Sequence, residues 1–313
     1  MSVICFGELL IDFVALENGV TVDRASGFEK APGGAPANVA VGLARLGHQS
    51  AFVGQVGDDP FGHYLADVLR DEGVAVDGLR FHPDARTALA FVSLADDGER
   101  SFVFYRHPSA DMLMTPADVA LAVIQRGKIF HFGSLTLIAP QSASATHHAV
   151  QTARESGLLI SYDPNLRLAL WDSDDHARQG LLSGLEYAHI VKISDEEVQF
   201  LTGTESVRSL WRDQTQLIVV THGRAGATAY LKGHDAGVYV AGFNVDAMDT
   251  TGAGDGFVAG LLAGILQHPA DYMDKLETIV RYANACGALT TTQRGAIPAL
   301  PTQQEVLGLL VGG

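Results

Sequence analysis

The chain has 313 residues, 47% of them hydrophobic, and a formal net charge of −15 at pH 7. This length suits one large α/β domain or two small ones. The acidic balance, with only 21 Lys and Arg, argues against a nucleic-acid binder or a membrane-surface binder, so a polyanionic substrate must be held by local donors or by a metal.

The cellular compartment is predicted from the amino-terminal residues, the lengths of the apolar runs and the two cysteines. The first residues carry no cationic leader pattern, and no apolar run reaches the length of a membrane-spanning helix. Cys5 lies in an expected strand and Cys286 in an expected helix, so the sequence favours neither a disulfide framework nor a zinc site. We therefore expect a cytoplasmic protein.

The first fifty residues contain two candidate ligand-facing side chains. Residues 3–6 form an apolar run typical of a buried strand, and residues 9–13 continue it with Asp12 embedded between apolar neighbours. Asp12 either faces a site at a strand end or accepts a local hydrogen bond. The stretch 33–47 combines a Gly-Gly turn, which lets the backbone approach a ligand closely, with a helix that ends in glycine. Asn38 lies in the first turn of this helix, where it either caps the helix or contacts a ligand.

A small accessory sheet is expected next. Residues 14–31 alternate weakly, and residues 87–94 and 101–106 alternate clearly between apolar and polar side chains. The turn sequence Asp96-Asp97-Gly98 between the latter two runs predicts a hairpin. We expect these strands to project from the main body as a lid. The lid covers two stretches: approximately 13–31 and 86–106.

Farther along the chain, short apolar runs each end in a polar cluster, and helical stretches separate them. These runs are residues 128–132, 158–162, 189–193 and 217–220. The pattern is typical of a parallel sheet covered by helices on both faces, and ligands of such sheets bind at the carboxyl ends of the strands. We expect one domain over residues 1–313, because no linker or repeat interrupts the chain.

The segment 249–255, Asp-Thr-Thr-Gly-Ala-Gly-Asp, precedes an apolar helical run over residues 256–266. Its glycine turn would present N–H groups at the positive end of a helix dipole, which is a site for an anion. The sequence lacks the Walker A and Rossmann patterns. The arrangement suits in-line phosphoryl transfer, with the turn amides neutralising charge and Asp255 accepting a hydroxyl proton. Taken alone, Asp255 is also a common helix N-cap.

Two stretches resemble the signatures of the pfkB, or ribokinase-like, carbohydrate kinases: DTTGAGD at 249–255 and GGAPANVAVGLARLG at 33–47. The resemblance covers nearly the whole chain and, within the family, is closest to fructokinases. Further stretches that carry it are GELLIDF (7–13), TALAFVSL (87–94), DGERSFVFYR (97–106), PSADMLMTP (108–116), DPNLRLALW (163–171) and KISDEE (192–197). It implies an α/β fold, a three-layer α/β/α sandwich with a mostly parallel central sheet and a small projecting β-sheet lid.

The resemblance also implies a role for each residue that matches a motif. The catalytic residues are Asp255 as the base and Gly252, Ala253 and Gly254 as the anion hole. The sugar-binding residues are Asp12, Gly33, Gly34, Asn38, Arg106, Arg167 and Asp255. The ATP-binding residues are Lys192, Ser194, Glu197, Thr221, Gly223, Gly226 and Asn284. The ligands of a K⁺-like monovalent cation, partly backbone carbonyls, are Asp249, Thr251, Thr290, Gln293, Gly295 and Ala299.

Some of these assignments leave alternatives open. Arg106 could be a solvated arginine at a strand end, and Arg167 could form a salt bridge to a nearby acid. The family often has Asn-x-x-Glu where this chain has Ser194 to Glu197. Glu197 keeps the acidic position that helps to organise Mg²⁺ and phosphate through water. Ser194 is shorter than Asn, which puts a direct contact from this position in doubt.

The sequence thus predicts an ATP-dependent kinase that phosphorylates D-fructose at its 6-hydroxyl, with Mg²⁺ and K⁺ as cofactors. One alternative is a kinase of another sugar, such as 2-keto-3-deoxygluconate or ribose. The other is a catalytically silent regulator that binds sugar or nucleotide. The expected partners are small molecules and a second copy of the chain, because the family often dimerises through the lid sheet.

Overall fold

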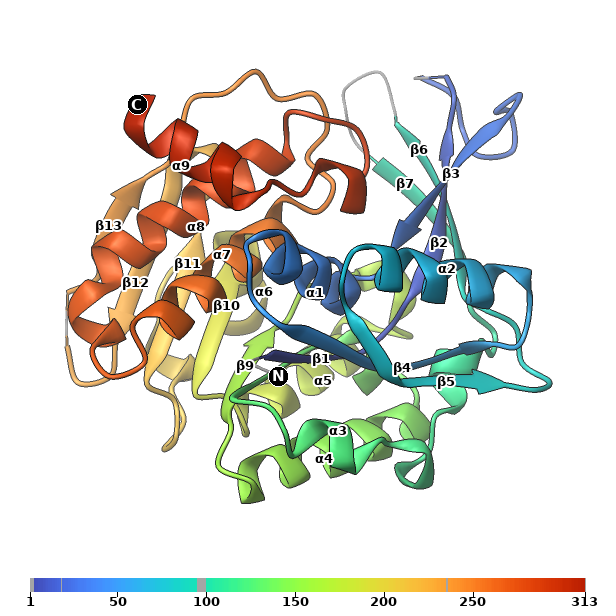
Figure 1. Cartoon of the computed structure of the whole chain (residues 1–313), viewed down its shortest axis with the longest axis horizontal. Coiled ribbons are helices and arrows are strands. Elements are labelled where there is room, and N and C mark those ends of the chain that lie inside the picture. Colours follow the sequence, from blue (N-terminus) through green and yellow to red (C-terminus); the bar gives the residue numbers. More distant parts are fainter. Residues whose placement is uncertain (1–2, 18, 95–99, 235, 313) are drawn as a thin grey trace.

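The computed structural model describes residues 3–17, 19–94, 100–234 and 236–312. Its centre is a nine-stranded sheet in the order β13-β12-β11-β10-β9-β8-β1-β4-β5 (Figure 1). Strands from β11 across to β5 are parallel to their neighbours, while β12 and β13 add an antiparallel edge. The strands are β1 (Val3–Phe6), β4 (Ser50–Gly57), β5 (Ala75–His82), β8 (Ile129–Gly133), β9 (Leu159–Asp163), β10 (Ile190–Ser194), β11 (Leu217–Thr221), β12 (Gly226–Leu231) and β13 (Val238–Ala241).

Helices cover both faces of this sheet (Figure 1). On one face lie α1 (Ala35–Arg45), α2 (Pro60–Asp71), α7 (Ala253–Gln267), α8 (Leu276–Thr290) and α9 (Gln303–Gly312). On the other face lie α3 (Leu121–Ile124), α4 (Pro140–Glu155), α5 (Asp174–Leu185) and α6 (Asp195–Thr202). Each face has its own hydrophobic core, because side chains of the parallel strands alternate between the two faces. The expected three-layer α/β/α architecture is confirmed.

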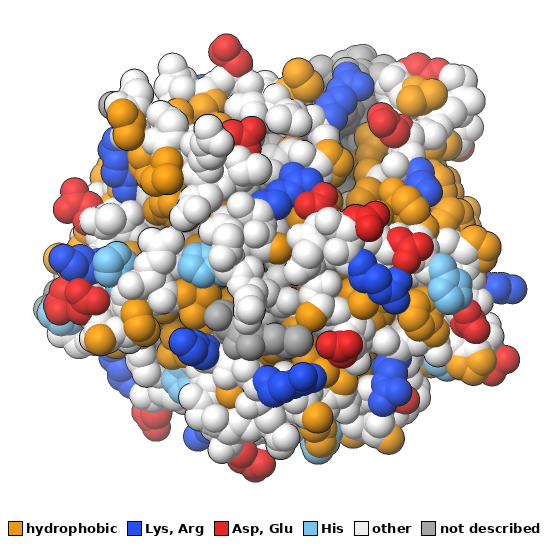
Figure 2. Space-filling model, in the orientation of Figure 1, with side chains coloured by type: hydrophobic (Ala, Val, Ile, Leu, Met, Phe, Trp, Pro, Cys, Tyr) orange, Lys and Arg blue, Asp and Glu red, His pale blue; other side chains and the backbone are white. Residues whose placement is uncertain are grey.

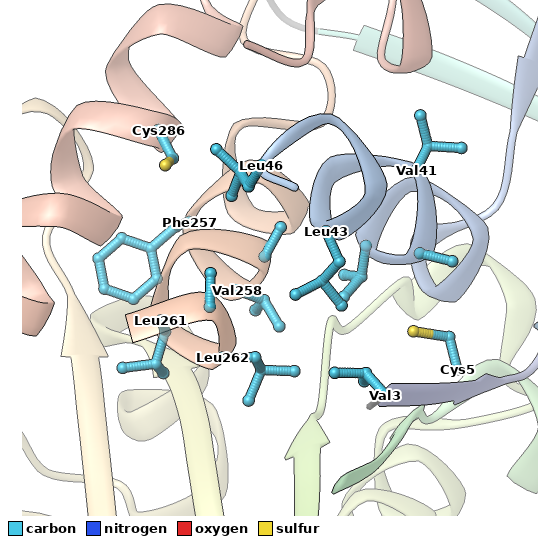
Figure 3. Packing of buried hydrophobic residues seen from close by; sticks show 14 of the residues in the cluster. Val3, Cys5, Val41, Leu43, Leu46, Phe257, Val258, Leu261, Leu262 and Cys286 are labelled. Atoms are coloured by element: carbon cyan, nitrogen blue, oxygen red, sulfur yellow. The ribbon is translucent and has the colours of Figure 1, made fainter. Parts of the chain in front are cut away.

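Helix α7 is apolar on every side because it is buried on every side. It packs between α1 and α8 above the sheet, and residues from Asp255 to Ile265 are buried. In Figure 3, Leu43 of α1, Leu262 of α7 and Val3 of β1 belong to the same hydrophobic cluster between these helices and the sheet. Gly260 faces α8 so closely that a Cβ there would lie 2.8 Å from the Cα of Ala283. This packing fixes the position of the amino-terminal end of α7, where the glycine turn lies.

A second, four-stranded sheet in the order β3-β2-β6-β7 projects from the main body (Figure 1). Its strands are β2 (Leu10–Ala15), β3 (Phe28–Gly33), β6 (Leu89–Leu94) and β7 (Arg100–Tyr105). The expected hairpin is present as the antiparallel pair β6–β7, and its turn at Asp96-Asp97-Gly98 lies outside the described residues. Apolar side chains gather over this part of the surface (Figure 2), where Val103 and Tyr105 are 41% and 64% exposed.

The structure differs from the sequence-based expectation in several elements. The run 9–13 does not continue the first strand: the chain breaks at Gly7 and Glu8, and β2 enters the small sheet. Helix α1 starts at Ala35, so Asn38 lies in its first turn as expected, whereas α7 starts at Ala253 rather than residue 256. Strands β5, β12 and β13 were not predicted from the sequence. Within the described residues, every helix is too short or too polar to span a lipid bilayer.

Candidate active site

Two cavities meet at the carboxyl ends of the central strands. The larger has a volume of about 570 Å³ and the smaller about 170 Å³. Both are lined by Thr250 and Gly254, so the turn before α7 forms a wall between them. The smaller cavity is bounded on its other sides by α1 and the small sheet, through residues such as Asn38 and Phe104. The larger is bounded by the loop after β11 and by α8. A ligand in one cavity would therefore face a ligand in the other across a single turn.

The turn itself is shaped by Gly252, which is the N-cap of α7 and has a φ of 77°. Only glycine adopts this left-handed conformation at little cost. A Cβ at this position would also lie 2.9 Å from the Cβ of Ala296. The N–H of Ala253 donates to the Thr250 carbonyl over 3.3 Å, whereas those of Gly252 and Gly254 donate to no acceptor within the described part of the chain. These free N–H groups lie at the positive end of the α7 dipole and are suited to an anion.

Asp255 lies at the third position of α7, so it is inside the helix and Gly252 is the cap. Its side chain is buried, and its Oδ2 accepts a hydrogen bond of 2.7 Å from Nδ2 of Asn38. Burial raises the pKa of Asp255 to about 6, with a further upward contribution from the Asp163 carboxylate, against the lowering effects of Asn38, Arg167 and Lys192. Carboxyl groups whose pKa is raised by burial are common among general bases. The capping alternatives for Asp255 and Asn38 do not describe this geometry, because their side chains bond each other across 217 positions of sequence.

The expected sugar-binding residues are mostly brought together. Asp12, Gly34, Asn38 and Arg167 line the smaller cavity with Asp255. Gly33 lies behind Asp12, where a Cβ would clash with the Asp12 carboxylate. At Gly34, φ is 111° and a Cβ would strike the backbone carbonyl of Glu8, so glycine lets α1 begin against this wall.

Arg106 is placed differently from the expectation. It is 2% exposed, lies outside the lining of both cavities, and its Nε donates to Oδ2 of Asp111 over 2.9 Å. A second guanidinium nitrogen donates to the Leu135 carbonyl over 3.3 Å. The arginine therefore supports the wall of the smaller cavity from behind, and the solvated alternative is excluded as well. Arg167, by contrast, is exposed and its Nη1 donates to the Leu166 carbonyl, without an ion pair to a described acid.

The lining of the smaller cavity also includes residues that were not expected there, among them Glu8, Phe104, Leu135 and Asn165. Glu8 is 2% exposed and its Oε1 accepts the N–H of Ala35, the first residue of α1, over 2.9 Å. Burial raises its pKa to about 7. The signal in the sequence was a glutamate two residues after a buried strand, at the carboxyl end of the strand, where ligands of parallel sheets bind.

Lys192 lies beneath the turn. Its Nζ is 3.1 Å from Oδ2 of Asp163, and it lies 3.2 Å from where a Cβ of residue 254 would be. Burial lowers the pKa of the lysine, but the carboxylates of Asp163 and Glu197 outweigh burial, so the pKa stays above its usual value. A permanently charged ammonium group therefore lies next to the free N–H groups of the turn. This places a positive charge where an anion would bind.

Ser194 and Glu197 form a capping box at the start of α6. Ser194 Oγ accepts the N–H of Glu197 over 3.2 Å, and Glu197 Oε2 accepts the N–H of Ser194 over 2.8 Å. Glu197 Oε1 accepts the N–H of Leu166 over 2.6 Å, so this side chain joins the start of α6 to the loop that carries Arg167. Ser194 therefore has a local structural role, which accounts for the tolerance of a short side chain at this position.

The larger cavity is lined by Thr221, Gly223, Gly226 and Asn284, as expected for the nucleotide site. The first three of these residues lie at the connection between β11 and β12: Thr221 ends β11, Gly223 lies in the loop and Gly226 begins β12. The loop is held by His222, whose Nε2 lies 2.9 Å from Thr228 Oγ1 and whose Nδ1 lies 3.2 Å from Asp195 Oδ2. Asn284 donates from Nδ2 to the carbonyls of Val240 and Ala241 at 3.0 and 3.1 Å, so it ties α8 to the end of β13.

Asp249 connects the two segments expected around a monovalent cation. Its Oδ1 accepts the N–H and the hydroxyl of Thr251 at 2.9 and 2.7 Å, and its Oδ2 accepts the N–H of Gly295 over 2.9 Å. Thr290 donates its hydroxyl hydrogen to the Cys286 carbonyl over 2.8 Å, and its backbone carbonyl is the group expected to face a cation. A carboxylate among backbone carbonyls is a donor set of hard oxygen atoms, which fits an alkali cation. Gln293 and Ala299 lie on the segment that follows α8, where Gln293 is exposed and Ala299 is buried.

Comparison with known proteins gives consistent matches over the whole chain. The model of the pfkB family carbohydrate kinase matches residues 1–303. Probable fructokinase-4 of Arabidopsis thaliana is 51% identical over 99% of this chain and 97% of its own length. Fructokinase-1 of Oryza sativa subsp. japonica is 52% identical over 98% of this chain and 97% of its own length.

Solved structures agree with these sequence matches. The fructokinase of Xylella fastidiosa with bound ATP has a TM-score of 0.90 at 37% identity and covers 99% of this chain and 98% of its own. The fructokinase of Vibrio cholerae O395, in a form with bound fructose, ADP and calcium ion, has a TM-score of 0.87 at 38% identity, with the same two coverages.

Proposed function

The chain belongs to the pfkB family of carbohydrate kinases, and on this premise we propose that it transfers the γ-phosphoryl group of ATP to the 6-hydroxyl of D-fructose, giving fructose 6-phosphate and ADP. The observation that carries this proposal is the position of Asp255. Its carboxyl group lines the smaller cavity at the turn that also walls the larger one. A sugar hydroxyl beside Asp255 would therefore face a phosphate that enters from the nucleotide side.

The smaller cavity would hold the sugar, and Asp255 would act as the base. Because Asn38 occupies Oδ2 of Asp255, Oδ1 is the oxygen that would accept the hydroxyl proton. The hydroxyl oxygen then attacks the γ-phosphorus, and the bond to the β,γ-bridging oxygen of ATP breaks. The Asn38 hydrogen bond fixes the orientation of the carboxylate during this step. Asp12 and Arg167 would hold other oxygens of the sugar.

The larger cavity would hold ATP, with its triphosphate directed toward the turn. The free N–H groups of Gly252 and Gly254 would bind the transferring phosphoryl oxygens, and the Lys192 ammonium group would add a positive charge. The loop at Thr221 and the side of α8 at Asn284 would hold the nucleoside. Donors fixed by a packed helix cost little reorganisation when charge develops on the phosphoryl group.

Two cations complete the proposal. Each carboxylate oxygen of Glu197 accepts one backbone N–H and keeps lone-pair capacity for a metal-bound water, so Glu197 could help to hold Mg²⁺ through water. Mg²⁺ would supply neutralisation of phosphate charge. A monovalent cation such as K⁺ would lie near Asp249, where it would stabilise the turn that carries the free N–H groups.

The small sheet would act as a lid over the sugar and as the contact surface of a homodimer. It forms part of the wall of the smaller cavity through Asp12 and Phe104, so its closure would exclude water and limit hydrolysis of ATP. Its outer side carries a cavity of about 490 Å³, lined by apolar side chains that include Phe91 and Tyr105. We place the enzyme in the cytoplasm, where free thiols such as those of Cys5 and Cys286 persist.

The test is an ADP-release assay over a panel of sugars, with and without K⁺. We expect the highest kcat/KM for fructose and a rise in rate on addition of K⁺. A preference for ribose or 2-keto-3-deoxygluconate would identify another sugar kinase. The keto acid is disfavoured by the carboxyl groups of Glu8, Asp12 and Asp255, against Arg167 alone, in the lining of the sugar cavity. An absence of ADP release with every sugar of the panel would support a silent binding protein.

A further inference from the structure

Glu8 is a buried acid with only half of its carboxyl group engaged. It follows β1 at the wall of the smaller cavity and is 2% exposed. Its Oε1 accepts the N–H of Ala35 over 2.9 Å. Its Oε2 is buried and has no hydrogen-bond partner among the residues that the structure describes. A buried carboxyl oxygen without a donor is costly, which calls for a partner that the chain itself does not supply.

The charged side chains nearest to Glu8 do not supply this donor. Arg106 lies close enough to lower the pKa of Glu8, but its guanidinium group donates to Asp111 and to the Leu135 carbonyl instead. Asp111 raises the pKa of Glu8 and can only accept. The ion pair thus keeps a positive charge behind Glu8 while leaving Oε2 without a hydrogen bond.

A second buried acceptor in the same cavity has the same property. Asn38 donates from Nδ2 to Asp255, while its Oδ1 is buried and lacks a partner within the described residues. Glu8 and Asn38 both line the smaller cavity. A cavity with two buried acceptors that have no hydrogen-bond partner is complementary to a ligand that carries several hydroxyl donors and no negative charge.

We propose that Glu8 is a specificity-determining sugar-binding residue, whose Oε2 accepts a hydrogen bond from a hydroxyl group of the ketose and whose charge disfavours sugar acids. The inference rests on the proposed function and adds a residue to its sugar site. Oε1 meanwhile keeps its bond to Ala35, so one carboxyl group fixes both the start of α1 and the sugar. Since α1 carries Asn38, this bond also sets the distance from Glu8 to the residue that orients the base.

The test is Glu8→Gln, with Glu29→Gln as the matched control on an exposed position of the small sheet. Glutamine has an acceptor oxygen at one position and an NH2 donor at the other, so it cannot present an acceptor both to the Ala35 N–H and at the position of Oε2. At pH 8, where the Glu8 carboxyl with its pKa of about 7 is mostly ionised, we expect KM for fructose to rise about 10- to 100-fold, the range for losing a hydrogen bond to a charged group. KM for ATP should stay within about twofold, and the ratio of kcat/KM for fructose over 2-keto-3-deoxygluconate should fall. Glu29→Gln should leave all of these values unchanged.

A purely structural role for Glu8 would give a different result. It would lower the melting temperature and kcat of Glu8→Gln, with KM for fructose and the sugar preference as in the parent, and this would overturn the inference. If Glu8→Gln folds poorly, the rise in melting temperature on adding fructose without ATP is compared in the parent and in Glu8→Asp. An equal rise in both also contradicts the inference. A parent chain without fructose turnover is a distinct outcome that removes the proposed function itself.

Discussion

Asp255 shows how an acid at the start of a buried helix becomes a base. Its position near the positive end of α7 would stabilise its charge, but burial has the larger effect and raises its pKa to about 6. The helix end therefore remains available to a second anion, while the carboxylate keeps enough basicity to accept a proton near neutral pH. Asn38 holds one oxygen of the carboxylate and thus separates the tasks of its two oxygen atoms.

Replacing this base should remove activity and leave the fold intact. We expect Asp255→Asn to lower kcat by about 10²- to 10⁴-fold, the usual contribution of a general base. The folded-state pKa of Asp255 is raised from 3.8 to about 6. Ionisation of this carboxyl group therefore lowers the free energy of unfolding as the pH rises between these two values, and the full loss is present above about pH 6. The melting temperature of Asp255→Asn at about pH 8 should therefore equal or exceed that of the parent. A variant with kcat within about tenfold of the parent would show that Asp255 is not the base.

The pH profile should report the same group. Asp255 must be ionised to accept a proton, so activity is present above its pKa and is lost as the pH falls through about 6. The pKa of the ligand-free enzyme appears in kcat/KM, so we expect kcat/KM for fructose to fall about tenfold for each pH unit below this value. ADP is best quantified after quenching, so that no coupling enzyme imposes its own profile. A kcat/KM for fructose that stays constant down to about pH 4.5 would contradict the assignment.

At the scale of elements, the main device is the glycine turn fixed by helix packing. Gly252 provides the left-handed cap, and α7 is held between α1 and α8 so that the free N–H groups keep their direction. Asp249 ties the same turn to Gly295, on the segment that follows α8. Together these contacts stabilise the turn before any ligand binds, as preorganised catalysis requires.

Substitution of Gly252, the N-cap of α7, should lower kcat by more than the accompanying loss of stability accounts for. We expect Gly252→Ala to lower kcat by about 10²- to 10³-fold, because a shifted turn loses a donor to the phosphoryl group. Gly73→Ala is the matched control: Gly73 has a φ of 79°, follows α2, and has open space around a Cβ. Both variants should lose stability, but only Gly252→Ala should lose turnover. Equal kcat values in the two variants would argue against a role for the turn in catalysis.

Some of the strands and site residues could be predicted from the sequence, and others could not. The strand ends at Asp163, Ser194 and Thr221 were predicted because polar residues interrupt apolar runs there, and the structure confirms these ends. Strand β5 was missed because its residues are only partly buried and do not form an apolar run. The environment of Arg106 could not be read from the sequence, because its ion pair with Asp111 depends on how the chain turns after β7. Glu8 was missed because a break between two sheets looks like one continuous strand.

At the scale of the molecule, the small sheet links the sugar cavity to a second copy of the chain. Phe91 stacks on Phe13 at 5.1 Å and contacts Phe28 and Tyr105, which gives the sheet an aromatic face. Helix α2 covers this face at Phe13 through Phe61, while Val103 and Tyr105 remain exposed. An apolar face of this kind is typical of a surface that another chain covers. If a partner fixes the sheet, it also fixes Asp12 at the sugar.

The homodimer can be tested by introducing a charged side chain on the apolar face of the small sheet. We expect the parent chain to have the mass of a dimer by light scattering at micromolar concentration, and Val103→Glu to have the mass of a monomer, because a buried charge opposes association. Val238→Glu is the control, since Val238 is 39% exposed, against 41% for Val103, and lies on the edge strand of the large sheet. A monomeric parent, or an equal effect of both variants, would contradict a dimer through the small sheet.

The central claim is that the two cavities bring the 6-hydroxyl of fructose and the γ-phosphate of ATP together at Asp255. The most direct measurement is identification of the product by phosphorus NMR after incubation with fructose and ATP. We predict that fructose 6-phosphate appears in amounts equal to ADP, and that Asp255→Asn forms neither at a comparable rate. Phosphorylation at another hydroxyl, or ADP formation without a sugar phosphate, would contradict the claim.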